Sequence, residues 1–368
     1  MCNPPLAEGV VSKEELKNTD LTAKRNEWYF NPPSFLDKEL RKLVANERDL
    51  PLLYTFFNIT FMTLPAALLV FYFQSNTVGF IYYLANTLLF QERFILALHY
   101  SSHTGLFTSP TLEMYAPYFL TNFFGIPGGI YYLHHCVMHH VENNVFPWDL
   151  SSTEPYQRDN FFHFLHYWAR FWIAIWFELP YYAWTRGRKQ MAIQAVTCES
   201  IYLAVVITLY KINPVGTTWV LLVPLGVGSF LLMLGNWSQH IFVDPAKPKD
   251  NYHLTYNAIN HEFNQRTFND GYHVEHHANS RRHWTELPSN FMNNLEKYAA
   301  EDALVFDGVD FMTVGVMSFF GMYKSLAKKV VQLKKPEISL EEMEKRLRSR
   351  VVPIKRDDKG EQVKSKST

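Results

Sequence analysis

This sequence contains few cysteines and carries no net charge. Three cysteines occur in 368 residues and none forms a C-x-x-C pattern, which argues against a disulfide framework and a zinc finger. Lysine plus arginine and aspartate plus glutamate each number 35, so the net charge is zero. A balanced charge argues against a generic nucleic-acid binder, and we expect no nucleic-acid partner. The first fifty residues mix charges of both signs and lack the apolar core of a signal peptide.

Long apolar stretches, by contrast, are abundant. Hydrophobic residues make up 48% of the chain, and four runs carry few or no charges and match the thickness of a bilayer. We therefore expect four transmembrane helices, at residues 52–73, 77–98, 192–210 and 217–235. Residues 115–133 are also apolar, but they contain Pro117, Pro127 and three glycines, which indicates an irregular or re-entrant segment.

A further helix is expected at residues 161–184. Its residues Trp168, Trp172 and Trp176 recur every four positions and share one face, which is typical of a helix lying in the headgroup plane. A fifth span is the alternative interpretation. The predicted fold is all-α and polytopic. It has a cytosolic region at 1–50, a membrane domain with a cytosolic helical cap at 51–300, amphipathic and charged helices at 301–350 and a disordered tail at 351–368.

Nine of the fifteen histidines fall in groups whose members are three or four residues apart. Residues at this spacing share one face of a helix and can meet at one point. The groups are His99 with His103; His135 with His139 and His140; His240 with Asn236; and His273 with His276 and His277. Neutral imidazole is the commonest metal ligand, and nine imidazoles are more than one ion can hold. The sequence therefore predicts a two-metal site.

Two neighbours of these groups leave alternatives open. His134 is adjacent to His135 and either could be the ligand, although a spacing of four residues to His139 favours His135. Cys136 lies in the same run and is a second candidate, but a thiolate is not needed where imidazoles suffice.

Counting the membrane crossings places all the histidine groups on one side. Two spans precede His99 and two more lie between His140 and Asn236. Residues 1–50 carry eight lysines and arginines and residues 281–368 carry seventeen, whereas the short turns on the opposite side hold only Lys211. The positive-inside rule then puts both termini and the histidines in the cytosol. Lys364 and Lys366 resemble a dilysine retrieval signal, which favours the endoplasmic reticulum.

Together these motifs resemble those of the integral-membrane fatty acid desaturases. The resemblance covers residues 50–290 and rests on three histidine boxes and on a pair that follows the fourth span. These motifs are His99-x3-His103, His135-x3-His139-His140, His273-x2-His276-His277 and Asn236-x3-His240. The run from 268 to 277, Phe-Asn-Asp-Gly-Tyr-His-Val-Glu-His-His, is typical of the third box of acyl desaturases.

The resemblance implies two non-haem irons held by the nine histidines, with Asn236 reaching one iron through a water. It implies a desaturase that uses dioxygen to remove two hydrogens from a methylene pair of a fatty acyl lipid or acyl-CoA. The sequence has no haem-binding His-Pro-Gly-Gly motif, so the electrons are expected from a separate donor of the cytochrome b5 type. The spacing by itself does not select iron, because imidazole also suits zinc and copper.

Two other functions fit the same motifs. A lipid hydroxylase or other oxygenase would use the same di-iron centre and differ only in whether oxygen is transferred to the substrate. A non-catalytic membrane protein, such as a zinc-binding scaffold, would keep the fold and the histidines without the oxidation.

Overall fold

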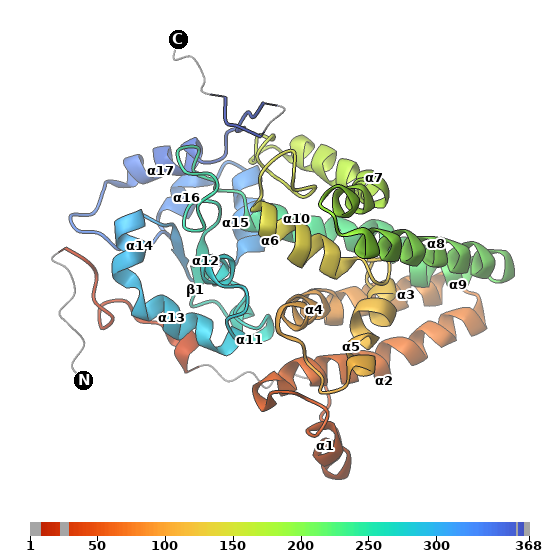
Figure 1. Cartoon of the computed structure of the whole chain (residues 1–368). Coiled ribbons are helices and arrows are strands. Elements are labelled where there is room, and N and C mark those ends of the chain that lie inside the picture. The colour runs from red at the N-terminus through yellow and green to blue at the C-terminus, as the bar shows by residue number, and fades with distance from the viewer. Residues whose placement is uncertain (1–8, 23–28, 358–359, 364–368) are drawn as a thin grey trace. The chain divides into compact units, whose positions relative to one another are not determined.

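The structure is a computed structural model that describes residues 9–22, 29–357 and 360–363. The chain falls into two compact units. Unit 1 comprises residues 1–24, 139–170 and 233–368, and unit 2 comprises residues 25–138 and 171–232. Both are mostly helical, in agreement with the predicted class (Figure 1). The tail lysines Lys364 and Lys366 lie outside the described residues.

Unit 2 consists of α-helices that alternate with shorter 3-10 and π-helical segments. Its helices are α1 (Ser34–Leu40), η2 (Glu47–Asp49), α2 (Leu50–Phe73), α3 (Asn76–Asn86), η3 (Thr87–Gln91), α4 (Glu92–Thr104), α5 (Pro110–Glu113), η4 (Tyr115–Phe119), η5 (Leu120–Phe123), most of η6 (Leu133–His139), α8 (Lys189–Ile212), α9 (Pro214–Thr217), η7 (Thr218–Leu222) and η8 (Pro224–Gly228). Two helices belong partly to each unit: α7 (Phe161–Thr185) and α10 (Ser229–Gln239).

Three helical stretches among the described residues are long and apolar enough to cross a membrane. They are Glu47–Phe73, Lys189–Ile212 and Pro214–Gln239. These ranges contain the first, third and fourth predicted spans, because each holds a predominantly apolar run of bilayer length. Three apolar helices of this kind fit an integral membrane protein.

The second predicted span is helical but is not one of these three. Residues 77–98 lie within α3, η3 and α4, and the polar residues Asn86, Gln91 and Arg93 lower the hydropathy of the run. Their side chains are buried within unit 2, where the Asn86 side-chain oxygen accepts a hydrogen bond from Thr63 at 2.7 Å. The Gln91 amide donates to the carbonyl of Phe124 at 3.1 Å. A fourth crossing stays a prediction.

The irregular segment is confirmed by its backbone. Residues 115–133 pass through the short segments η4 and η5 and then a non-helical stretch with positive φ angles at Gly125 and Gly129. A side chain at Gly125 would collide with the carbonyl of Pro224, so the close approach of these backbones requires glycine. Helix α7 forms over the predicted range, and its placement in the headgroup plane stays a prediction.

Unit 1 is helical except for one small parallel sheet. Its elements are η1 (Thr19–Leu21), α6 (His140–Glu142), β1 (Asn257–Ile259), α11 (Phe263–Arg266), α12 (His273–Ala278), η9 (Trp284–Glu286), α13 (Leu287–Asn293), α14 (Leu295–Glu301), β2 (Val305–Asp307), α15 (Phe311–Phe319), α16 (Tyr323–Ala327) and α17 (Leu340–Ser349). Strands β1 and β2 pair in parallel with Asn257 opposite Val305. This pair is a minor departure from the expected all-α fold.

The C-terminal part of unit 1 differs from the expectation at two places. Within the region where amphipathic and charged helices were expected, 301–350, residues 311–327 form two helices, α15 and α16, because Gly321 adopts a positive φ of 65° between them. The first residues of the tail expected to be disordered are packed: Val351 and Ile354 are buried, and Arg356 pairs with the buried carboxylate of Glu154. A capping box formed by Ser339 and Glu342 begins α17.

One buried guanidinium ties the chain segments of unit 1 together. The side chain of Arg158 is fully buried and donates to backbone carbonyls on three segments. Its Nε bonds to Ile241 at 3.0 Å, and one terminal nitrogen bonds to Arg350 and Val352, each at 2.9 Å. Its other terminal nitrogen reaches the carbonyls of its own loop. Arg158 thereby fixes the loop of residues 143–158 against the segment that follows α17 and against the chain after α10.

Replacing Arg158 by leucine should strongly destabilise unit 1. The substitution leaves buried carbonyl groups without donors, which costs about 1–3 kcal/mol for each group that water cannot reach. We expect the melting temperature of the detergent-solubilised protein to fall by several degrees or more, as followed by differential scanning fluorimetry. The exposed Arg281→Leu substitution is the control and should leave the melting temperature nearly unchanged. Equal melting temperatures for both variants would contradict this role of Arg158.

Candidate metal centre

Three histidines from two segments converge in unit 2. His99 and His103 lie one turn apart on α4, and His135 comes from the π-helical segment η6. The ring centroid of His135 lies 4.4 Å from that of His99 and 5.2 Å from that of His103. One ring nitrogen of each histidine lies within 4.8 Å of the others, which is a suitable separation for ligands of one ion.

The structure separates His135 from its neighbour His134. The ring of His134 packs edge-on against Phe171 at 5.0 Å, while His135 stacks on Tyr131 and faces the other two histidines. The thiol of Cys136 lies 3.7 Å from Nδ1 of His103, within the range of a weak sulfur hydrogen bond. Of the two alternatives left open by the sequence, His135 is therefore the one placed among the candidate ligands.

A second group of three histidines forms in unit 1. His139 is the last residue of η6, His240 follows α10, and His277 is on α12. Their ring centroids are 5.0 to 5.4 Å apart, and one nitrogen of each lies within 4.8 Å of the others. All three side chains are buried. His135 and His139, four residues apart on the π-helical segment η6, belong to different groups of candidate ligands.

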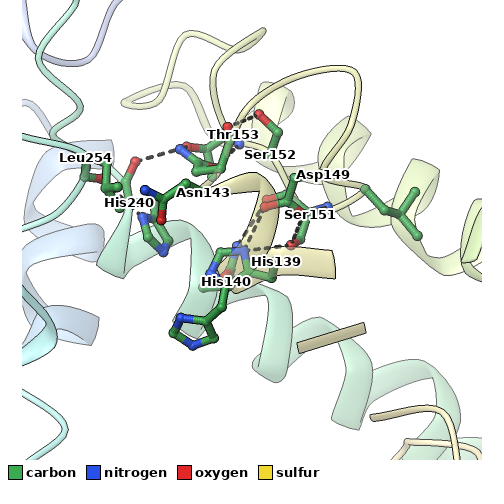
Figure 2. Close-up of polar contacts among 12 residues, drawn as sticks. His139, His140, Asn143, Asp149, Ser151, Ser152, Thr153, His240 and Leu254 are labelled. Carbon is green, nitrogen blue, oxygen red and sulfur yellow. Dashed lines mark hydrogen bonds and ion pairs between the residues drawn. The ribbon is translucent and has the colours of Figure 1, made fainter. Parts of the chain in front are cut away.

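Each histidine of this triad is bound through the same ring nitrogen. Nδ1 of His139 lies 2.7 Å from a carboxylate oxygen of Asp149, and Nδ1 of His240 lies 3.1 Å from the carbonyl of Leu254 (Figure 2). Nδ1 of His277 lies 3.3 Å from the side-chain oxygen of Asn143. Because all three partners are acceptors, Nδ1 carries the proton in each ring and Nε2 is left with the lone pair.

Burial keeps two of these rings, those of His240 and His277, neutral. It lowers the pKa of His240 to about 3, and repulsion from His139 acts in the same direction. The pKa of His277 is likewise held well below its usual range, first by burial and then by the histidines around it. A neutral imidazole can bind a metal, whereas an imidazolium cannot.

The unit 1 triad has the unsatisfied nitrogen atoms that a metal ion would bind. Within the described part of the chain, Nε2 of His240 and Nε2 of His277 are buried and have no hydrogen-bond partner. A buried polar atom without a partner costs free energy, and coordination to a metal removes this cost. The donor set of soft neutral nitrogens suits iron, zinc or copper rather than calcium or magnesium.

The remaining boxed histidines are also in unit 1. Nε2 of His140 and Nε2 of His276 lie 3.0 Å apart, so both are directed at the same point. His273 is one turn before His277 on α12, and their ring centroids are 4.8 Å apart. The spacing predicted for the third box is thus realised on a short helix that is buried at five of its six residues.

Asn236 has its amide nitrogen fixed by protein contacts. This nitrogen donates to the phenol oxygen of Tyr167 at 2.7 Å and to the carbonyl of Ser151 at 3.2 Å. Because both partners accept from the nitrogen, these contacts also identify the other end of the Asn236 amide group as the oxygen. Asn236 lies four residues before His240, as the sequence indicated, and its role as a ligand through water stays a prediction.

Several residues of the site were missed by the sequence. Asp149, Asn143 and Tyr167 each contact a predicted ligand, and of the three only Asn143, four residues after His139, stands at helical spacing from a box. The chain positions of the other two gave little signal, since Asp149 belongs to a loop and Tyr167 is one of many aromatic residues of α7. Acidic residues near the boxes have other partners: Glu275, for example, accepts a hydrogen bond from Tyr298 at 2.9 Å.

A third group of possible ligands has an ordinary explanation. Asp250, His253 and Glu301 lie close together, but both ring nitrogens of His253 already contact carboxylates, those of Asp244 and Glu301, at 3.3 Å. Glu301 also pairs with Lys247 at 2.7 Å. This group is accounted for as a network of ion pairs.

A family model described as fatty acid desaturase matches residues 74–308, which is more than half of the chain. The chain belongs to the fatty acid desaturase family. The matched range contains all nine boxed histidines. No curated protein and no solved structure matches the sequence. Membership of this family makes the protein a membrane enzyme of the fatty acid desaturase and hydroxylase type, an oxidoreductase acting on fatty acids.

Replacing His240 by alanine should weaken metal binding by this fatty acid desaturase family member. The substitution removes one of three converging nitrogens, and we expect a loss of affinity of about 100-fold or more, since even outer-shell substitutions cost 10–100-fold. Metal content of the purified protein, measured by mass spectrometry, checks this. His163→Ala is the matched control, because His163 is exposed on α7 and lies outside the clusters. Equal metal content in both variants would remove His240 from the site.

Proposed function

We propose that this protein is an oxygen-dependent desaturase that introduces a double bond into a fatty acyl chain. The observation that carries the proposal is the pair of histidine triads, one in each unit, within a chain of the fatty acid desaturase family. The triad of unit 1 is buried, and two of its rings are held neutral by burial.

We propose that two irons are held by the nine boxed histidines, with Asn236 reaching one of them through a water. Unit 2 supplies three of these histidines and unit 1 the other six. The ligands are His99, His103, His135, His139, His140, His240, His273, His276 and His277. Bound iron supplies the oxidising power, with dioxygen and two electrons, that breaking unactivated C–H bonds requires.

The protein side chains have a different task from those of an acid–base enzyme. A methylene group has no acidic proton for a side chain to abstract, so a general base would be of no use there. The protein instead has to hold its imidazoles neutral, fix which nitrogen faces the metal, and exclude water. In unit 1, burial keeps the rings of His240 and His277 neutral, and the Nδ1 contacts of all three triad histidines fix which nitrogen faces the metal.

Apolar cavities in unit 2 support an acyl substrate. One of about 600 Å³ is lined by side chains of α2, α8 and η7, among them Leu68, Ile201 and Leu221. A smaller pocket of about 40 Å³ is lined by Tyr131 and His134 together with residues of α7. Since Tyr131 stacks on His135, this pocket adjoins a candidate ligand. Predominantly apolar walls suit a hydrocarbon chain.

The remaining features of the proposal concern the membrane in which the protein lies, its topology and its electron donor. We propose a protein of the endoplasmic reticulum membrane, with four spans and with both termini and the histidines in the cytosol. The electrons come from a separate donor of the cytochrome b5 type, and the basic residues Arg281 and Arg282 are candidates for its docking surface. Hydroxylation on the same centre is distinguished by product mass, since desaturation removes two hydrogens and hydroxylation adds one oxygen.

Expression in a desaturase-deficient yeast should produce an unsaturated fatty acid that the host lacks. Gas chromatography with mass spectrometry of the total fatty acids is the measurement, and the His277→Ala variant should yield none of this product while remaining in the membrane fraction. His163→Ala should behave as the wild type. A product heavier by one oxygen would replace desaturase by hydroxylase, and purified protein holding zinc without consuming oxygen would favour the non-catalytic scaffold.

A further inference from the structure

We propose that Asp149 is a positioning residue for the metal centre, holding His139 so that its Nε2 atom faces the metal. The inference rests on the proposed function in so far as His139 is a ligand. It adds a residue outside the histidine boxes, on a loop that the sequence marks only as polar.

The carboxylate of Asp149 is fully occupied on its two oxygens. One oxygen lies 2.7 Å from Nδ1 of His139, and the side chains of both residues are almost completely buried. The other oxygen accepts hydrogen bonds from the hydroxyl and the backbone N–H of Ser151, at 2.7 and 2.8 Å. These two bonds from Ser151 fix the plane of the carboxylate, and the fixed carboxylate fixes the imidazole ring.

The same turn also holds two other residues of the site. The carbonyl of Ser151 accepts from the amide of Asn236 and from the phenol of Tyr167, both at 3.2 Å. Two residues later, the hydroxyl of Thr153 donates to the backbone carbonyl of His240 at 3.0 Å (Figure 2). The segment 149–153 therefore contacts His139, Asn236 and His240, which come from distant parts of the chain.

The negative charge of Asp149 indicates that its contact with His139 does more than fill space. A carboxylate without solvent contact is costly unless a positive charge or several donors compensate it. The ring of His139 also lies 5.1 Å from the ring of His240 and 5.4 Å from the ring of His277, the other two members of the triad. A metal cation at the triad would supply the compensating charge, and the carboxylate would in turn raise the basicity of His139 as a ligand.

Glu154 provides a matched control on the same loop. It is a fully buried carboxylate five residues after Asp149, but its partner is the guanidinium of Arg356 rather than a histidine. Changing Glu154 to glutamine disturbs the packing of the loop and leaves the contact with His139 in place. A purely structural role of buried carboxylates would make the two substitutions equivalent.

The test compares metal release from the wild type, Asp149→Asn and Glu154→Gln, using the full-length protein in detergent. Each protein is loaded with Co²⁺, and the rate of transfer to an excess of a chelator is measured together with the melting temperature of the metal-free protein. We expect Asp149→Asn to release Co²⁺ about 10–100-fold faster than the wild type. Glu154→Gln should release it within about threefold of the wild-type rate, even where its melting temperature falls further.

A double-mutant cycle with His139 separates positioning from folding. In a His139→Ala background, Asp149→Asn should have no further effect on metal release, because its only route to the metal is gone. If both carboxylate variants accelerate release equally, or if Asp149→Asn acts equally with and without His139, the inference is overturned. Should Asp149→Asn fail to fold, the cycle is made with Asp149→Glu, for which a normal release rate supports the inference and an additive effect overturns it.

The outcome is independent of whether the proposed reaction is correct. Wild-type protein that binds no metal at all, or binds it with no product in yeast, would contradict the proposed function. Wild-type protein that holds metal tightly and desaturates lipid, while Asp149→Asn retains Co²⁺ as well as Glu154→Gln, would contradict only the role of Asp149.

Discussion

A buried imidazole has two ring nitrogens to satisfy, and for two histidines of the unit 1 triad, His240 and His277, the described part of the chain offers a partner to Nδ1 and none to Nε2. Nδ1 of His139, His240 and His277 is bound to an oxygen, and burial keeps the latter two rings neutral. Leaving buried lone pairs without partners costs about 1–3 kcal/mol each. A bound metal ion offsets that cost. The triad can therefore be understood as a buried cation-binding site, and much of unit 1 packs around this site.

The supporting structure can be followed outward from the triad. The loop of residues 143–158 contacts all three histidines, through Asn143, Asp149 and Thr153. Arg158 then joins this loop to the chain after α10 and to the segment that follows α17. The C-terminal segment is thus part of the support for the site rather than a separate tail. In unit 2, polar side chains along α3, η3 and α4 are buried. The exposed face of this helical stretch is therefore apolar, although the stretch carries polar residues.

The sequence predicted two histidine pairs correctly and the surroundings of the histidines poorly. Spacings of three and four residues are a strong signal on an α-helix, and His99 with His103 and His273 with His277 meet as expected. His135 and His139 have the same spacing but belong to different groups of candidate ligands. Asp149 reaches the site through loop geometry, which depends on contacts distant in sequence such as those of Arg158. The second predicted span illustrates another limit: its polar residues are buried against neighbouring helices, and hydropathy cannot register such contacts.

X-ray absorption at the iron edge of the purified, full-length protein tests the central claim most directly. If the nine histidines hold two irons, the spectrum will show near two irons per chain and a first shell dominated by nitrogen, with the outer-shell scattering that imidazole rings produce. A first shell without imidazole scattering, or a sulfur contribution from Cys136, would contradict the ligand set described above.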